Sequence, residues 1–250
     1  MDINLVLLAA IVFGASFAQG FSGFGYGILA MAMLSLLTAG LERASVFITL
    51  TVTALVITLL LRSRRDVRLD WRQAGAIFLG VLAGSPLGYW FVLRQGDLPL
   101  CRLVFGTVLI LFALNGLLKP HIKHHIPTLL APLFGVFSGL LSGAFASGGP
   151  PVVLYLYAQE DDPRLAVGTV QAVFLGASIY RLVIVGCGER GFSADLLLLA
   201  AGMVPVVILG TLTGYMAARR VSCRTFLLCA YSLIIAAGAM NIAKGLRALE

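Results

Sequence analysis

The sequence predicts an all-α polytopic membrane protein made of two inverted repeats, each a glycine-broken helix or hairpin plus three spanning helices. Of its 250 residues, 60% are hydrophobic and only 12% are charged, whereas a soluble domain carries about 25% charged residues. Apolar stretches of about 20 residues, the length that crosses a bilayer, recur along nearly the whole chain. A glycine-rich segment near the start also recurs about half a chain later. The composition therefore leaves no room for a soluble domain.

Six apolar segments are each long enough to span a bilayer once, and short polar stretches separate them. These segments are 42–61, 73–93, 100–118, 165–186, 196–216 and 225–243. Two further apolar regions, 4–39 and 128–158, are too long for one helix and are interrupted by glycine clusters. Asp2 precedes the first region without a basic segment or a small-residue cleavage site, so we read residues 4–18 as mature protein and not as a signal peptide.

Short motifs recur in the same order in both halves of the chain, which indicates an internal duplication. FSGFGYG resembles LSGAFASGGPP, so that Ser22-Gly23 corresponds to Ser142-Gly143, and Arg43 in LERASV corresponds to Arg164 in DPRLAV. GSPLGYW resembles GTLTGYM, and LCRLVFG resembles SCRTFLL. The duplication divides the chain into a first membrane repeat, 1–120, and a second, inverted repeat, 121–250.

The arginine-rich stretch 62–72 sets the orientation, because basic short loops mark the cytoplasmic side of a membrane protein. Counting spans forward places the equivalent stretch 187–195 outside, so the repeats insert with opposite orientation, as in many secondary transporters. Both termini then lie outside, and in a bacterium the chain is a multi-pass protein of the inner, cytoplasmic membrane. The basic loops also account for the net charge of +7, so nucleic acid is not an expected partner; the lipid bilayer is.

The glycine clusters predict two helix breaks. Irregular backbone at membrane depth is tolerated only where it is buried in protein or lines a cavity, so breaks at equivalent points of two inverted halves meet near the midplane. Each break frees backbone N–H groups at the start of a half-helix, where anions bind, and Pro150 or Pro151 suits such a first turn. The candidate substrate-binding residues at the breaks are Gln19, Ser22, Gly23, Gly25 and Tyr26 in the first half and Ser147, Gly148 and Gly149 in the second.

Two other glycine rows keep the four-residue spacing of closely packed membrane helices. They are Gly80, Gly84 and Gly88, and Gly135, Gly139 and Gly143. We assign both rows to helix packing. Packing glycines on an outer face would also permit a homodimer.

The polar spans beside the breaks supply three further candidates. Thr49 and Thr51 of the first half correspond to Thr169 and Gln171 of the second. We expect Thr49 and Gln171 to lie at the site, because a polar side chain within an apolar span needs a partner or water. The alternatives are hydrogen bonds within their own helix for the threonines and a hydrogen bond between helices for Gln171. Arg181 either snorkels to the interface or supplies positive charge to an anion path. All eleven Asp and Glu lie at termini, loops or span ends. The hydroxyl, amide and backbone groups that remain at membrane depth are hydrogen-bond donors that suit a weakly hydrated oxyanion.

Two segments carry a resemblance to a known family. GFSGFGYGILAMAML (20–34) and GLLSGAFASGGPPVVLYLY (139–157), followed by LAVGTVQAVF (165–174), resemble the two signature segments of the TauE/SafE sulfite exporter family. The first departs from the family pattern, because alanine and methionine follow Gly27 where members often have more glycines and a proline. The resemblance implies a transporter in the cytoplasmic membrane, usually an exporter, for sulfite, sulfoacetate or other organosulfonates. Carried over by position, it favours Ser22, Gly23, Gly25, Ser147, Gly148, Gly149 and Gln171.

We expect this transporter to work by alternating access around a central anion site, without a cofactor. An intramembrane serine protease is the enzyme alternative, since Ser147 precedes Gly148, but all three histidines lie in loop 119–127 and none reaches membrane depth to act as a base. The same histidines, in HIKHH, leave a transition-metal transporter as a second alternative. The four cysteines form no CxxC pair, and we expect no disulfide framework.

Overall fold

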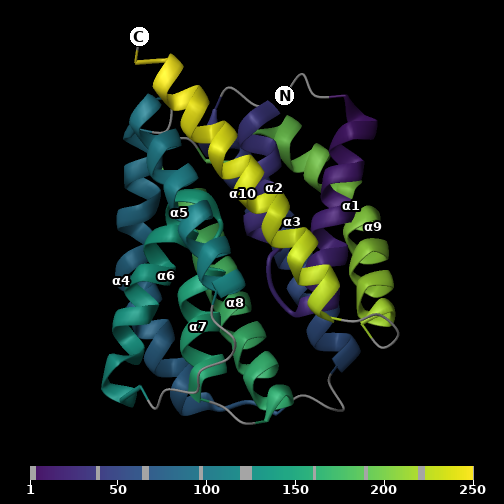
Figure 1. Cartoon of the computed structure of the whole chain (residues 1–250), viewed down its shortest axis with the longest axis vertical. Coiled ribbons are helices and arrows are strands. Elements are labelled where there is room, and N and C mark those ends of the chain that lie inside the picture. The colour runs from purple at the N-terminus through teal and green to yellow at the C-terminus, as the bar shows by residue number, and fades with distance from the viewer. Residues whose placement is uncertain are drawn as a thin grey trace.

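The computed structural model describes residues 4–37, 40–63, 68–95, 98–118, 126–159, 162–188, 191–218 and 223–249. These residues form ten α-helices and one short 3-10 helix, with no strand among them (Figure 1). The helices of the first half are α1 (Leu5–Ser22), α2 (Tyr26–Leu37), α3 (Leu41–Ser63), α4 (Trp71–Gln95) and α5 (Pro99–Leu118). Those of the second half are η1 (Thr128–Leu130), α6 (Ala131–Phe145), α7 (Gly149–Gln159), α8 (Pro163–Gly186), α9 (Ala194–Ala217) and α10 (Cys223–Arg247). Each of the six predicted segments forms one helix, with bounds that differ by a few residues.

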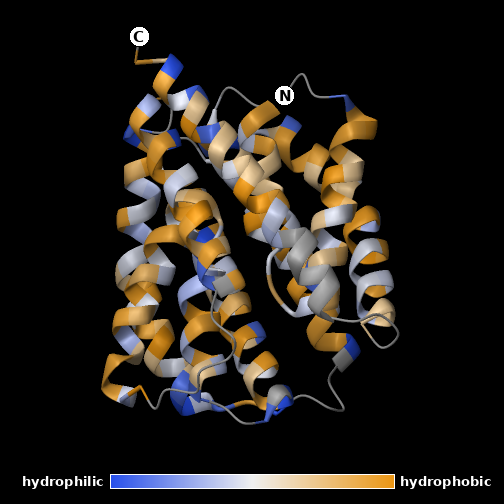
Figure 2. Ribbon diagram, in the orientation of Figure 1, coloured by the Kyte–Doolittle hydropathy of each residue, from blue (hydrophilic) through white to orange (hydrophobic). Residues whose placement is uncertain are grey.

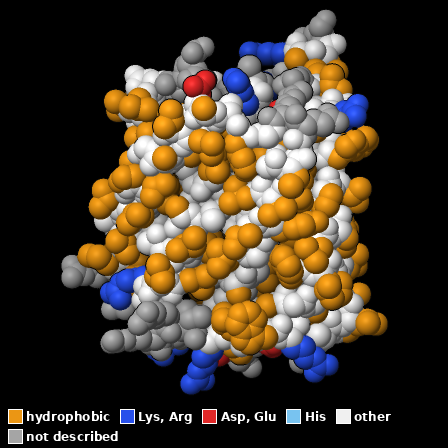
Figure 3. All heavy atoms as spheres, turned by 180° about the vertical axis from the view of Figure 1, so that it is seen from behind, with side chains coloured by type: hydrophobic (Ala, Val, Ile, Leu, Met, Phe, Trp, Pro, Cys, Tyr) orange, Lys and Arg blue, Asp and Glu red, His pale blue; other side chains and the backbone are white. Residues whose placement is uncertain are grey.

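Six helical segments combine the length and the apolarity needed to cross a membrane, which confirms the polytopic α-helical fold. Hydrophilic residues gather at the two ends of the helices (Figure 2). Hydrophobic side chains cover the middle of the face seen in Figure 3, and Lys and Arg lie toward its ends. Large apolar side chains such as Leu79 and Trp90 on α4 and Leu198 and Leu209 on α9 are exposed, as lipid-facing residues are expected to be.

The two long apolar regions each fold into a helical hairpin. In the first, α2 returns to the end of the molecule that holds the start of α5 and the end of α10, because Arg102 donates to the Ser35 carbonyl at 2.6 Å and Lys244 to the Leu36 carbonyl at 2.6 Å. In the second, the side-chain amide of Gln159 at the end of α7 donates to the carbonyl of Ile126, just before α6. Both predicted breaks are therefore real, and each is the turn of a hairpin.

The hairpins enter from opposite ends of the molecule. We call the end that carries Arg68 the basic end; there Arg68 lies 3.9 Å from Asp162, and the amide of Asp70 donates to Thr169 at 3.1 Å. We call the end where α1 begins and α10 finishes the terminal end (Figure 1). The α1–α2 hairpin opens toward the terminal end and the α6–α7 hairpin toward the basic end.

Helix packing is reciprocal between the halves. The most extensive helix–helix contact joins α6 of the second half to α4 of the first. The corresponding pair is α1 of the first half and α9 of the second, and α5 packs on α10. Glycine allows the closest of these approaches: a Cβ added at Gly135 of α6 would overlap the Ile77 carbonyl of α4, and one at Gly214 of α9 would overlap the Phe17 carbonyl of α1. The packing role of the two glycine rows is confirmed. Because the rows face each other between α4 and α6, they do not offer a surface for a second copy.

Candidate functional site

The first break is built by glycine and capped by a glutamine. Gly23 ends α1 in the left-handed region, with φ 83°, and Gly25 has φ 109°, conformations that only glycine adopts without strain. The amide of Gly23 donates to the carbonyl of Gln19 at 2.8 Å. The side-chain Oε1 of Gln19 in turn accepts from the backbone N–H of Tyr26 at 3.0 Å, so that it caps the first residue of α2.

The second break reaches the same shape with other residues. Ala146 ends α6 in the left-handed region, with φ 52°, and its amide donates to the Ser142 carbonyl at 2.9 Å. Helix α7 begins at Gly149 with Pro150 and Pro151 in its first turn, as the sequence predicted. The residue that corresponds to Gly23 as a helix cap is thus Ala146. Gly143, which the sequence motifs align with Gly23, lies inside the last turn of α6.

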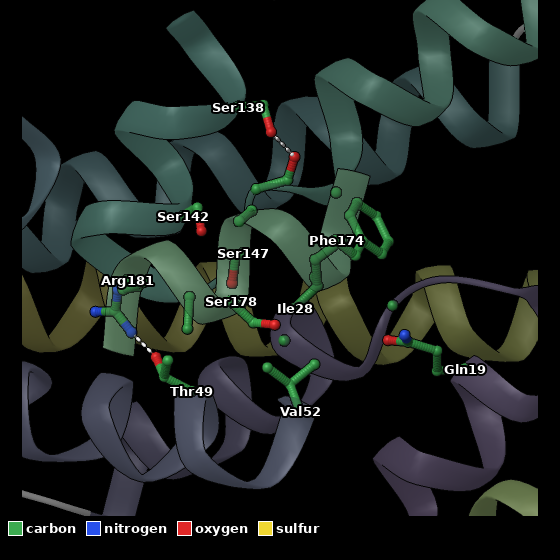
Figure 4. Close-up of a pocket in the computed structure, with 16 residues that line it drawn as sticks. Gln19, Ile28, Thr49, Val52, Ser138, Ser142, Ser147, Phe174, Ser178 and Arg181 are labelled. Carbon is green, nitrogen blue, oxygen red and sulfur yellow. Dashed lines mark hydrogen bonds between the residues drawn. The ribbon is translucent and has the colours of Figure 1, made fainter. Parts of the chain in front are cut away.

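The two breaks touch, and a cavity of about 50 Å³ lies beside the contact. A Cβ added at Gly27 would overlap the carbonyl oxygen of Ala146 and lie 3.5 Å from the Cα of Ser147, so the two main chains are in direct contact. On the same measure one water needs about 10–15 Å³, so the cavity admits one small solute. The residues that line this central cavity, several of them labelled in Figure 4, are Gln19, Gly25, Gly27, Ile28, Thr49, Val52, Ser138, Ser142, Ala146, Ser147, Gly148, Gly149, Phe174, Ala177, Ser178 and Arg181.

The structure brings most of the predicted site residues to this cavity. Those that line it are Gln19, Gly25, Thr49, Ser147, Gly148, Gly149 and Arg181. Ser22, Gly23 and Gln171 instead line a second cavity of about 240 Å³ between α1, α3, α8 and α9. Tyr26 lines neither; it is fully buried, and its hydroxyl donates to Thr51 at 2.6 Å.

Arg181 is buried inside the protein, with 1% of its surface exposed, so the snorkelling alternative is wrong. Its guanidinium makes hydrogen bonds to Ser45, to Gly143 and to the hydroxyl of Thr49 (Figure 4). All of these acceptors are carbonyl or hydroxyl oxygens. The positive charge of Arg181 therefore stands at the wall of the central cavity with uncharged hydrogen-bond partners.

Gln19 faces the cavity from the opposite side and carries an unused donor (Figure 4). The side chain is 2% exposed, and its Nε2 has no hydrogen-bond partner among the described residues. A buried donor without a partner costs about 1–3 kcal/mol, which a bound acceptor would recover. Among the described residues, no Asp or Glu lines the cavity, and α2 and α7 both begin there with the positive ends of their dipoles. The arrangement suits a small anion.

The other polar candidates mainly bond within the protein. Gln171 donates from Nε2 to the Gly23 carbonyl, the bond between helices that was its alternative role. Thr49 donates to the Ser45 carbonyl of its own helix at 2.8 Å, although it also accepts from Arg181. Sequence reasoning missed Ser138, which lines the cavity; it lies on the small-residue face of α6 that was assigned to packing.

The serine-protease alternative depends on Ser147, and the transition-metal alternative depends on the three histidines. The Ser147 hydroxyl donates to the Phe145 carbonyl at 3.0 Å, a backbone acceptor and not a catalytic base. His121, His124 and His125 lie outside the described residues.

Comparisons with known proteins place this architecture in a family. The model of the family described as sulfite exporter TauE/SafE matches residues 8–240. The probable sulfite/organosulfonate exporter TauE of Cupriavidus necator is 29% identical over 231 residues, which cover 85% of this chain and 83% of that protein. No solved structure matches the chain. Because the family match spans most of the sequence, this chain belongs to the sulfite exporter TauE/SafE family of membrane transporters.

Proposed function

We propose that the chain exports a small sulfur oxyanion, sulfite or an organosulfonate, across the cytoplasmic membrane through the central cavity. The observation that carries the proposal is the cavity itself. It lies where two broken helices meet, with a buried arginine on one side and an unpartnered amide donor on the other, and without a carboxylate in its lining. The name of the Cupriavidus relative agrees with this class of substrate.

The donors around the cavity match the oxygens of a sulfite or sulfonate group. Gln19 offers an amide N–H, and the hydroxyls of Ser142 and Ser147 lie in the wall. The first turns of α2 and α7 leave backbone N–H groups without partners inside their helices. Such preorganised neutral donors bind oxyanions at helix starts. A volume of about 50 Å³ favours the compact sulfite ion, so larger organosulfonates require the cavity to widen.

We further propose that the halves 1–120 and 121–250 are inverted copies that move against each other in alternating access. The reciprocal pairing of α6 with α4 and of α1 with α9 supports this, as does the entry of the hairpins from opposite ends. On this view the basic end faces the cytoplasm, because it carries loop 62–72. The cavity at Gln171 is then the cytoplasmic approach to the site.

Flux in proteoliposomes tests the proposal. Sulfite, sulfoacetate, taurine and sulfate are compared in the parent chain and in Gln19→Glu, which keeps the Oε1 acceptor for Tyr26 and replaces the donor by a negative charge. We expect sulfite flux in the parent and a loss of about tenfold or more in the variant, the loss expected for a charge-assisted hydrogen bond. Ser147→Ala should lower flux less, since it removes one hydroxyl. Absence of sulfur-oxyanion flux from the parent, or unchanged flux in Gln19→Glu at equal protein abundance, would exclude the proposed site.

A further inference from the structure

Helix α8 carries two polar side chains that each hold one of the broken hairpins. Near the basic end, Gln171 donates to the Gly23 carbonyl at the first break. Ten residues later, about 15 Å along the helix, Arg181 donates to the Gly143 carbonyl in the last turn of α6, from Nη2 at 2.9 Å and from Nε at 3.2 Å. The stretch of α8 between them lines the central cavity through Phe174. The site is thus bracketed by two side chains of α8, each bound to one hairpin.

Arg181 lies between the central cavity and a third cavity of about 330 Å³ at the terminal end. The order of residues along α3 shows this. Val46 lines the third cavity and Val52 the central one. Arg181 binds α3 at Ser45, next to Val46, and at Thr49, which lines the central cavity, so its bonds reach from one cavity to the other. The guanidinium therefore lies between the site and the terminal end.

Gln171 and Arg181 differ in the number of hydrogen bonds with which they hold the hairpins. Gln171 makes one neutral hydrogen bond to Gly23. Arg181 bonds to the Ser45 carbonyl at 2.7 Å, to the Ser45 hydroxyl at 2.9 Å and to the Thr49 hydroxyl, besides its two bonds to Gly143. It joins α8 to both α3 and α6. The hydrogen-bond acceptors of this buried guanidinium are neutral oxygens, and the Glu42 carboxylate, which lines the third cavity, also attracts it. An anion in the central cavity would add a second negative charge, on the side of the site.

We propose that Arg181 is an anion-released lock on the terminal side of the site. An anion in the central cavity, which Arg181 lines, offers negatively charged acceptors, and the guanidinium is attracted to these more strongly than to neutral oxygens because opposite charges interact strongly in a low-dielectric interior. The guanidinium then exchanges the oxygens of Ser45 and Gly143 for those of the anion, which releases α8 from α3 and α6. A neutral solute of equal size cannot make this exchange, so Arg181 also selects for charge. The inference rests on the proposed function, because it takes the transported anion as the releasing ligand.

Hydrogen–deuterium exchange measured by mass spectrometry tests the lock on the full chain in nanodiscs. The readout is exchange in α3 residues 41–49 and α6 residues 141–146, with and without sulfite, against chloride at equal ionic strength. In the parent we expect slow exchange that sulfite accelerates. In Arg181→Gln we expect exchange about tenfold faster without sulfite, the factor expected when a hydrogen bond to a charged group is lost, and no further response to sulfite.

Two variants separate the lock from a merely structural role. Arg181→Lys keeps the charge and loses the fork of donors, so basal exchange should rise while the response to sulfite remains. Gln171→Ala on the same helix should raise exchange around residues 19–27 and leave 41–49 unchanged. If Arg181→Gln does not fold, Ser45→Ala removes one acceptor and should give a smaller rise in the same α3 peptides.

The outcomes distinguish failure of the lock from failure of the proposed function. If Arg181→Gln leaves exchange at 41–49 unchanged, the lock is overturned whatever the sulfite flux. Where Arg181→Gln does not fold, unchanged exchange in Ser45→Ala overturns it in the same way. A parent that transports sulfite but shows no sulfite-dependent exchange overturns release by the anion. A parent without sulfite flux overturns the proposed substrate; faster exchange in Arg181→Gln would then still support the lock, and exchange measured with the other three solutes would identify the releasing ligand.

Discussion

The two helix breaks have the same plan and different residues. In the first, Gly23 and Gly25 supply the positive φ angles that turn the chain. In the second, Ala146 takes the left-handed cap, and it is the only non-glycine residue with positive φ among the described residues. A methyl group is therefore accepted at the cap of one hairpin. What the contact between the hairpins does require is the absence of a side chain at Gly27, which lies against the main chain of the other break.

The breaks also differ in how they treat their backbone donors. The first amide of α2 is capped by the side chain of Gln19. Helix α7 has Pro150 and Pro151 in its first turn, and proline has no N–H to satisfy. The first hairpin thus caps one backbone N–H group, whereas the second lacks two backbone N–H groups because prolines occupy those positions. The half-helices consequently offer different sets of N–H groups to a ligand, although both point their positive ends at the cavity.

The largest expected effect comes from Gly27→Ala. The added Cβ would overlap the Ala146 carbonyl, which is main chain and cannot rotate away, so the hairpins must separate. We expect flux in proteoliposomes to be abolished and the thermal unfolding temperature to fall, since overpacking costs about 1–3 kcal/mol or more. Gly14→Ala is the control in the same hairpin, because nothing lies within 4 Å of a Cβ there. A Gly27→Ala protein as active as Gly14→Ala would contradict the close contact.

Gly23→Ala should have the next largest effect. The new Cβ has room, its nearest neighbour being a Val167 methyl at 3.4 Å, so the cost is the left-handed backbone alone. That cost is about 1–2 kcal/mol. Denaturant unfolding in detergent measures it. An unchanged unfolding midpoint would mean that the first break does not need glycine at its cap.

The reverse substitution at the second break, Ala146→Gly, should be stabilising. It relieves the strain at φ 52°, and part of that gain is offset because glycine is freer in the unfolded chain. We expect a net gain of about 0.5–1 kcal/mol in the same unfolding experiment. Equal losses in Gly23→Ala and Ala146→Gly would show that the second break has its own need for alanine.

How far the sequence predicted the site depends on the range of the interactions involved. The breaks were predictable because glycine and proline act on the local backbone. The cap at Ala146 was not, since alanine is the best helix former and gives no signal of a break. The burial of Arg181 depends on Ser45 and Gly143, which only the tertiary fold brings to it. Gln171 was predicted to lie at the site, with a bond between helices as its alternative, and in the structure it donates to the first break and does not line the central cavity.

The smallest expected effect concerns selectivity and follows from Gly149→Ala. This glycine lines the central cavity at the start of α7, and a Cβ there would lie 3.3 Å from the ring of Phe174, which can shift by a few tenths of an ångström. Stability should therefore remain close to that of the parent, while the cavity loses volume. Because a cavity of about 50 Å³ already fits a compact anion closely, we expect the ratio of sulfite to sulfoacetate flux to rise. A uniform fall for both solutes would place the size limit elsewhere along the path, and an unchanged ratio with unchanged rates would mean that the second break does not line the transport route.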